Sequence, residues 1–97
     1  MTHEKKKDVI ARTYKVTGRV QGVGFRYFVK NKAEALGVRG YVRNEDDGGV
    51  FVYAAGDAAA ISELAAALHR GPQFSEVRTV EEKEAAVQKF SSFGIER

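Results

Sequence analysis

A short glycine-rich stretch at residues 18–26, with the sequence GRVQGVGFR, holds the groups best suited to chemistry. Gly22 and Gly24 allow positive φ angles that other residues resist, so successive backbone N–H groups can converge on one point. Such a point attracts an anion, and a helix beginning at Phe25 would add the partial positive charge of its N-terminus. Arg26 offers a planar fork of donors that matches two phosphate oxygens. The stretch therefore predicts a phosphate-binding site whose backbone donors come from Gln21, Gly22, Val23, Gly24 and Phe25.

The hydrophobic pattern places this stretch between a strand and a helix. Side chains alternate between apolar and polar over residues 13–20, which predicts a strand, and the apolar period becomes helical over 25–36. A lone Gly-x-Gly pair more often serves only to make a sharp turn, with the arginine a solvated surface charge. The other predicted elements are strands over 38–44 and 50–55 and a helix between Asp57 and Gly71. Weaker signals predict a strand over 77–80, with an extension to Glu84 left open, and a short strand around 90–95.

The order strand, helix, strand, strand, helix, strand is the split βαβ arrangement. It predicts an α+β protein with the ferredoxin-like fold, in which two helices cover one face of an antiparallel sheet of four to five strands. We expect a single domain over residues 13–97, preceded by a flexible N-terminal tail over 1–12.

This topology identifies a second candidate residue, Asn44, at the end of the second predicted strand. The first and second strands run in the same direction, so both end at the same edge of the sheet. The topology therefore places Asn44 beside residues 21–26, although an asparagine before a run of turn-forming residues is also ordinary turn chemistry.

Composition limits the class of protein. The chain has 97 residues, the length of one compact domain, and much of the basic excess behind its net charge of +3 lies in Lys5, Lys6 and Lys7. The charge therefore does not identify a partner. The absence of cysteine excludes disulfide bonds, thiolate metal sites and a cysteine nucleophile. Because no apolar run is long enough to cross a bilayer, we expect a cytoplasmic protein with no membrane contact. We also expect a monomer.

Two stretches of the chain match motifs of a known family. Residues 18–26 resemble the first signature of the acylphosphatases, and GYVRN at 40–44, followed by glycines at 48 and 56, resembles the second. The similarity extends in looser form from Tyr14 to the C-terminus. Tyr41 stands where many members have tryptophan.

The resemblance implies an activity and two roles. The activity is hydrolysis of the carboxyl–phosphate bond of acyl phosphates, which gives a carboxylate and inorganic phosphate. Arg26 would be the phosphate-binding residue, and Asn44 would orient the water that attacks directly.

The available side chains are compatible with this reaction, although none is an obvious general base. His3 lies near the N-terminus, and His69 is explained by favourable contact with the end of a helix. No acid catalyst is needed, because the leaving carboxylate has a pKa of about 4 to 5. The Asn44 carbonyl can accept a hydrogen bond from water while its amide donates to a phosphate oxygen. We therefore predict no cofactor.

Three acidic residues in the predicted hairpin turn, Glu45, Asp46 and Asp47, are candidate ligands for Mg²⁺. Consecutive residues of a turn point in different directions, which is typical of a solvated loop. We therefore predict no metal ion.

Two other classes of protein remain open. A nucleic-acid-binding module can share this fold, but Arg39-Gly40-Tyr41 supplies only the start of an RNA-recognition motif, so we predict no nucleic-acid partner. A sensor that binds acyl or carbamoyl phosphates with negligible turnover would use the same site. Tyr27, Tyr41 and Tyr53 are interpreted as packing residues outside the site.

Overall fold

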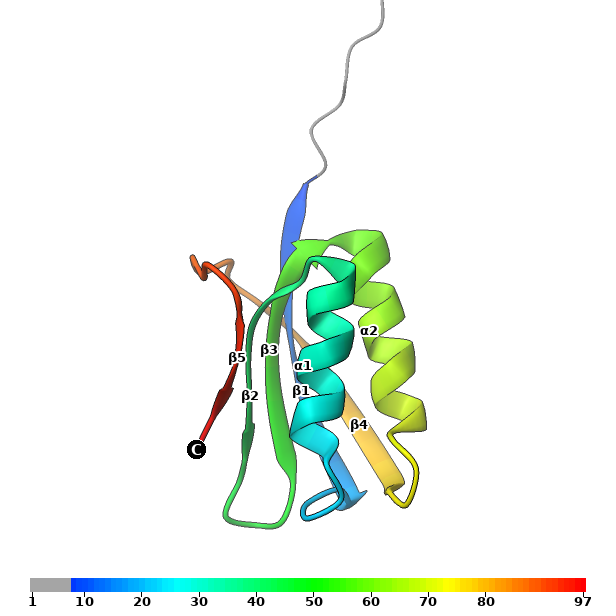
Figure 1. Ribbon diagram of the computed structural model, residues 1–97. Coiled ribbons are helices and arrows are strands. Elements are labelled where there is room, and N and C mark those ends of the chain that lie inside the picture. Colours follow the sequence, from blue (N-terminus) through cyan, green and yellow to red (C-terminus); the bar gives the residue numbers. More distant parts are fainter. Residues whose placement is uncertain (1–7) are drawn as a thin grey trace, which may run out of the picture.

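Five strands and two helices succeed one another in residues 8–97, the part of the chain that the structure, a computed structural model, describes (Figure 1). In chain order they are β1 (Val9–Arg19), α1 (Phe25–Leu36), β2 (Arg39–Asn44), β3 (Val50–Asp57), α2 (Ala58–Arg70), β4 (Glu76–Ala85) and β5 (Phe93–Glu96). The strands form one sheet in the order β4-β1-β3-β2-β5, and both helices cover the same face of it. The predicted ferredoxin-like fold is confirmed. Neither helix in this part of the chain is long and apolar enough to span a membrane.

The first strand begins earlier than its alternation predicts. Residues 9–12 pair with Asp57–Ala54 of β3, and Ala11 and Arg12 also pair with β4. The predicted tail is therefore wrong over residues 9–12, because pairing with β3 extends to Val9 and pairing with β4 extends to Ala11. Residues 1–7, the rest of the predicted tail, lie outside the described residues.

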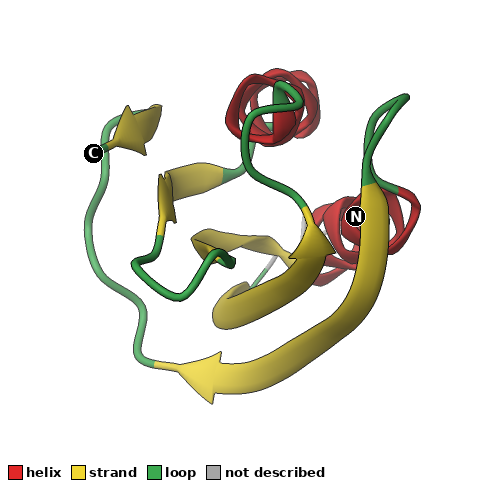
Figure 2. Cartoon of the chain, turned by 90° about the horizontal axis from the view of Figure 1, so that it is seen from below, coloured by secondary structure: helices red, strands yellow, loops and turns green. Residues whose placement is uncertain are grey.

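The last strand departs from the predicted antiparallel sheet. Antiparallel pairing holds for the first four strands, but β5 pairs with β2 in parallel. The reason is its connection: residues 86–92 lead from β4 at one edge of the sheet to β5 at the other (Figure 2). The Tyr53 hydroxyl holds this connection, since it donates to the Ala86 carbonyl at 2.6 Å and accepts from the Gln88 N–H at 2.7 Å.

The main core lies between the helices and the sheet. Val16 and Val52 from the sheet and Val29 and Leu64 from the helices are completely buried there. Each buried side chain of this kind contributes about 1.5–3 kcal/mol relative to an exposed position. The same core contains Val20 and Phe25, which stand at the two ends of the loop that precedes α1. Burial of these two residues anchors the loop on the domain.

Both helices have the ends that the sequence predicts. Gly37 ends α1 in a left-handed conformation, with φ 72°. The Asp57 side chain caps α2, because its Oδ1 accepts a hydrogen bond from the Ala60 N–H at 2.9 Å.

Candidate active site

The loop between β1 and α1 has the backbone that its glycines predict. Gly22 and Gly24 have φ angles of 75° and 76°. A Cβ atom at either position would meet nothing within 4 Å, so the backbone conformation, and not a lack of space, favours glycine. Gly24 is the N-cap residue of α1, and no side chain within residues 8–97 caps this helix. Its first N–H groups are therefore available to an anion.

Arg26 lies in the first turn of α1 and is half-buried. Its Nη1 donates a hydrogen bond to the backbone carbonyl of Glu96 at 3.2 Å. Glu96 belongs to β5, which reaches this end of the molecule through its parallel pairing with β2. The last strand thus orients the guanidinium group from the opposite end of the chain.

Asn44 lies where topology predicts it. It is the last residue of β2, pairs with Val50 across the β2–β3 hairpin, and is half-buried. Asn44 and Arg26 line one hollow of about 230 Å³ together with Gly22 and Gly24. The predicted juxtaposition of Asn44 with the loop is therefore confirmed. The remaining lining residues are Val20, Phe25 and Tyr27.

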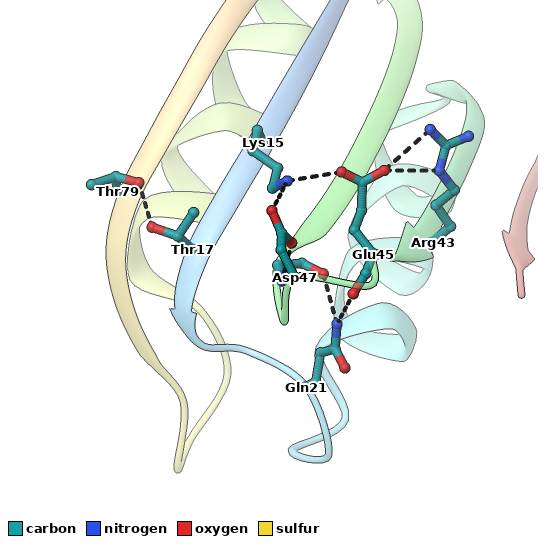
Figure 3. Close-up of polar contacts among 8 residues, drawn as sticks. Lys15, Thr17, Gln21, Arg43, Glu45, Asp47 and Thr79 are labelled. Carbon is teal, nitrogen blue, oxygen red and sulfur yellow. Dashed lines mark hydrogen bonds and ion pairs between the residues drawn. The ribbon is translucent and has the colours of Figure 1, made fainter.

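Two predicted members of the loop do not line this hollow. Val23 packs against the main core. The Gln21 side chain turns to the β2–β3 hairpin, where its Nε2 donates to the carbonyls of Glu45 at 2.8 Å and Gly49 at 2.9 Å (Figure 3). The two hydrogen bonds tie the loop to the turn that follows Asn44. A side-chain clamp of this kind was not part of the predicted role of Gln21.

Two carboxylates of the acidic hairpin turn form ion pairs with neighbouring basic side chains. Lys15 Nζ contacts Glu45 Oε1 at 2.9 Å and Asp47 Oδ2 at 2.7 Å, and Arg43 contacts Glu45 Oε2 at 3.2 Å (Figure 3). Hydrogen bonds from Lys15 lower the pKa of both carboxyl groups, and the carboxylates of Asp47 and Glu45 raise the pKa of Lys15. No cluster of three or more His, Cys, Asp or Glu side chains that could hold a metal ion occurs within residues 8–97.

The three tyrosines interpreted as packing residues have different environments in the structure. Tyr41 and Tyr53 stack on the sheet face opposite the helices, with ring centroids 5.8 Å apart, so packing is confirmed for them. Tyr27 is 69% exposed and lines the hollow beside Arg26. Its position just after Arg26, off the apolar face of α1, was the available sequence signal.

A glycine turn that leads into a helix, with an arginine and an amide beside it, is an arrangement suited to an oxyanion, here carried by a ferredoxin-like domain. Comparison with known proteins gives the family. The family model described as Acylphosphatase matches residues 12–95.

Individual relatives agree with the family match. A curated acylphosphatase of Solibacter usitatus is 54% identical over 85 residues, which is 88% of each chain. The acylphosphatase structure from Bacillus subtilis superposes with a TM-score of 0.88 at 36% identity, covering 91% of this chain and 99% of that one. The structure from Coxiella burnetii gives a TM-score of 0.89 at 35% identity, covering 99% and 100%. The chain belongs to the acylphosphatase family and is a hydrolase of acyl phosphates.

Proposed function

We propose that Arg26 and the backbone N–H groups of residues 21–26 bind the phosphoryl group of an acyl phosphate, while Asn44 orients the attacking water. The observation that carries this proposal is the shared hollow, which brings the start of α1 together with the end of β2. An anion there meets the guanidinium group, the uncapped end of α1 and an amide.

Binding of the phosphoryl oxygens supplies most of the catalysis. Water attacks phosphorus, the bond between phosphorus and the carboxyl oxygen breaks, and the electron pair leaves with the carboxylate. Phosphoryl transfer through a loose transition state is accelerated mainly by in-line placement and by balancing charge on the equatorial oxygens. Arg26 balances the charge on the equatorial oxygens, and its hydrogen bond to the Glu96 carbonyl orients the guanidinium group before the substrate binds.

Asn44 places the attacking water in line with the bond that breaks. Its carbonyl oxygen accepts a hydrogen bond from the water, and its amide donates to a phosphate oxygen. Ion pairs of Lys15 and Arg43 with the neighbouring Glu45 fix the end of β2, and this keeps Asn44 in position to orient the water. The substrate phosphate takes the proton of the water, since the hollow is lined by no carboxylate or histidine of the described chain.

The structure argues against the RNA-binding alternative. Tyr41 and Tyr53 lie on the sheet face opposite the helices, the face on which such modules stack bases. Here Phe90 covers both rings, with centroid distances of 5.7 Å and 5.4 Å. The aromatic platform is therefore used in internal packing. A sensor without turnover would share the proposed site, so a rate measurement separates the two.

Hydrolysis of benzoyl phosphate, followed by ultraviolet absorbance with a chelator present, tests the proposal. We expect turnover by the parent and a loss of about three to five powers of ten in both Arg26→Ala and Arg26→Lys, because a point charge cannot replace the guanidinium fork. Arg78→Ala is the matched control, since Arg78 is exposed on β4 and does not line the hollow.

Three results would contradict the proposal. Full activity in a folded Arg26→Ala variant would remove Arg26 from the site. Strong activity in Arg26→Lys would contradict two-pronged binding. Phosphate binding without turnover by a folded parent would favour the sensor.

A further inference from the structure

Tyr27 is an exposed aromatic side chain beside the proposed phosphate site. It follows Arg26 in the first turn of α1 and is 69% exposed. The buried face of this helix is formed by Phe25, Val29 and Ala33, which point to the sheet. Tyr27 thus lies off the face that packing explains, and its ring is available to a ligand in the hollow.

The roles proposed for the other lining residues leave the Tyr27 ring to contact the acyl group. Under the proposed function, Arg26 and the loop hold the phosphoryl group and Asn44 holds the water. Val20 and Phe25 also line the hollow but are only 1% and 2% exposed. The two lining glycines have no side chain. Among the lining residues of the described chain, Tyr27 is the exposed side chain left to contact the acyl group.

The reaction geometry is compatible with the same assignment. In an in-line displacement, the leaving oxygen stands opposite the attacking water. The acyl group therefore departs on the side of phosphorus away from the water that Asn44 of β2 holds, and Tyr27 lines the same hollow from α1. A phenol ring offers a flat apolar face on which another planar group stacks with an offset.

We propose that Tyr27 forms an acyl subsite that selects planar, aromatic acyl groups over small aliphatic ones. This inference rests on the proposed function and adds the class of substrate to it. The ring face carries the selection, so phenylalanine can replace Tyr27.

The test compares benzoyl phosphate with acetyl phosphate. Their leaving carboxylates have similar acidity, so the ratio of their kcat/KM values reports recognition of the acyl group. We expect the parent to prefer benzoyl phosphate and Tyr27→Ala to lower kcat/KM for it about three- to tenfold. For acetyl phosphate the loss is less than about twofold, and Tyr27→Phe keeps the parent ratio.

Phe74→Ala is the matched control, because Phe74 is 76% exposed and does not line the hollow. It must leave the ratio unchanged. An unchanged ratio in Tyr27→Ala, or an equal change in Phe74→Ala, would overturn the subsite and leave the proposed function intact. The subsite is also overturned if Tyr27→Phe loses the preference, because the hydroxyl would then be responsible. Inactivity of the parent toward both substrates would overturn the proposed function and the subsite with it.

Discussion

Replacement of Gln21 tests whether the loop and the β2–β3 hairpin act as one unit. The Gln21 amide donates two hydrogen bonds, at 2.8 Å and 2.9 Å, to carbonyls that flank the turn after Asn44. A net contribution of about 0.5–1.5 kcal/mol per hydrogen bond gives about 1–3 kcal/mol for the pair. Gln21 is half-buried, so water can satisfy part of the lost bonding, and we expect about 1–2 kcal/mol for Gln21→Ala.

Gln21→Glu sharpens the experiment. The side chain keeps its length, but an ionised carboxylate cannot donate to either carbonyl and adds a negative charge near Glu45. We expect it to be at least as destabilising as alanine at neutral pH. Urea unfolding gives the free energies, and thermal unfolding should show a fall of about 4–8 °C per kcal/mol in a domain of this size.

Activity provides the second measurement for the Gln21 variants. Loss of the clamp lets Asn44 move relative to the loop, and a misplacement of about 1 Å can cost about a hundredfold in rate. We therefore expect kcat to fall by about ten- to a hundredfold in both variants. The control is Gln88→Ala, because the Gln88 side chain is exposed in the 86–92 connection. If Gln21→Glu matched the parent in stability and kcat, the clamp would have no role.

Two further variants test Asn44 and the ion-pair cluster. Asn44→Ala should lower kcat strongly with a modest change in KM, because the amide acts on the nucleophile; steady-state kinetics would show the reverse pattern if Asn44 only bound phosphate. Hydrogen bonds from Lys15 lower the pKa values of Glu45 and Asp47 from their ordinary values of 4.5 and 3.8. The two ionised carboxylates therefore stabilise the fold above those values, and this contribution is lost as pH falls below them. Lys15→Met should therefore show a smaller loss of stability in urea titrations between pH 6 and pH 3, and a loss equal to that of the parent would refute the linkage.

Local patterns predict the parts of this fold that local physics determines. Asp57 is recognisable as a cap because its carboxylate can reach an N–H three residues on. Gly22 and Gly24 are recognisable because a left-handed backbone favours glycine. Asn44 needs one step more, since its place beside the loop follows from the order of strands and not from its neighbours in sequence.

Long-range contacts between side chains and backbone are the part that the sequence does not reveal. Gln21 bonds to carbonyls at positions 45 and 49, and Arg26 bonds to the carbonyl of Glu96. A backbone carbonyl is present at every position, so such a bond requires no particular residue type in the acceptor and leaves no pattern. The parallel direction of β5 is similar, because it depends on where residues 86–92 cross and not on the composition of a four-residue strand.

These hidden contacts explain why the glycine loop requires the rest of the domain. Gly22 and Gly24 can direct N–H groups to an anion, but the guanidinium of Arg26 is held by β5 and the loop is held to the hairpin by Gln21. The strand β5 in turn pairs with β2, the strand that carries Asn44. Arg26, which binds the phosphate in the proposal, and Asn44, which orients the water, are thus both supported by the β2–β5 strand pair. It follows that a change that detaches β5 should impair phosphate binding and water placement together, whereas a change at Asn44 should impair mainly water placement.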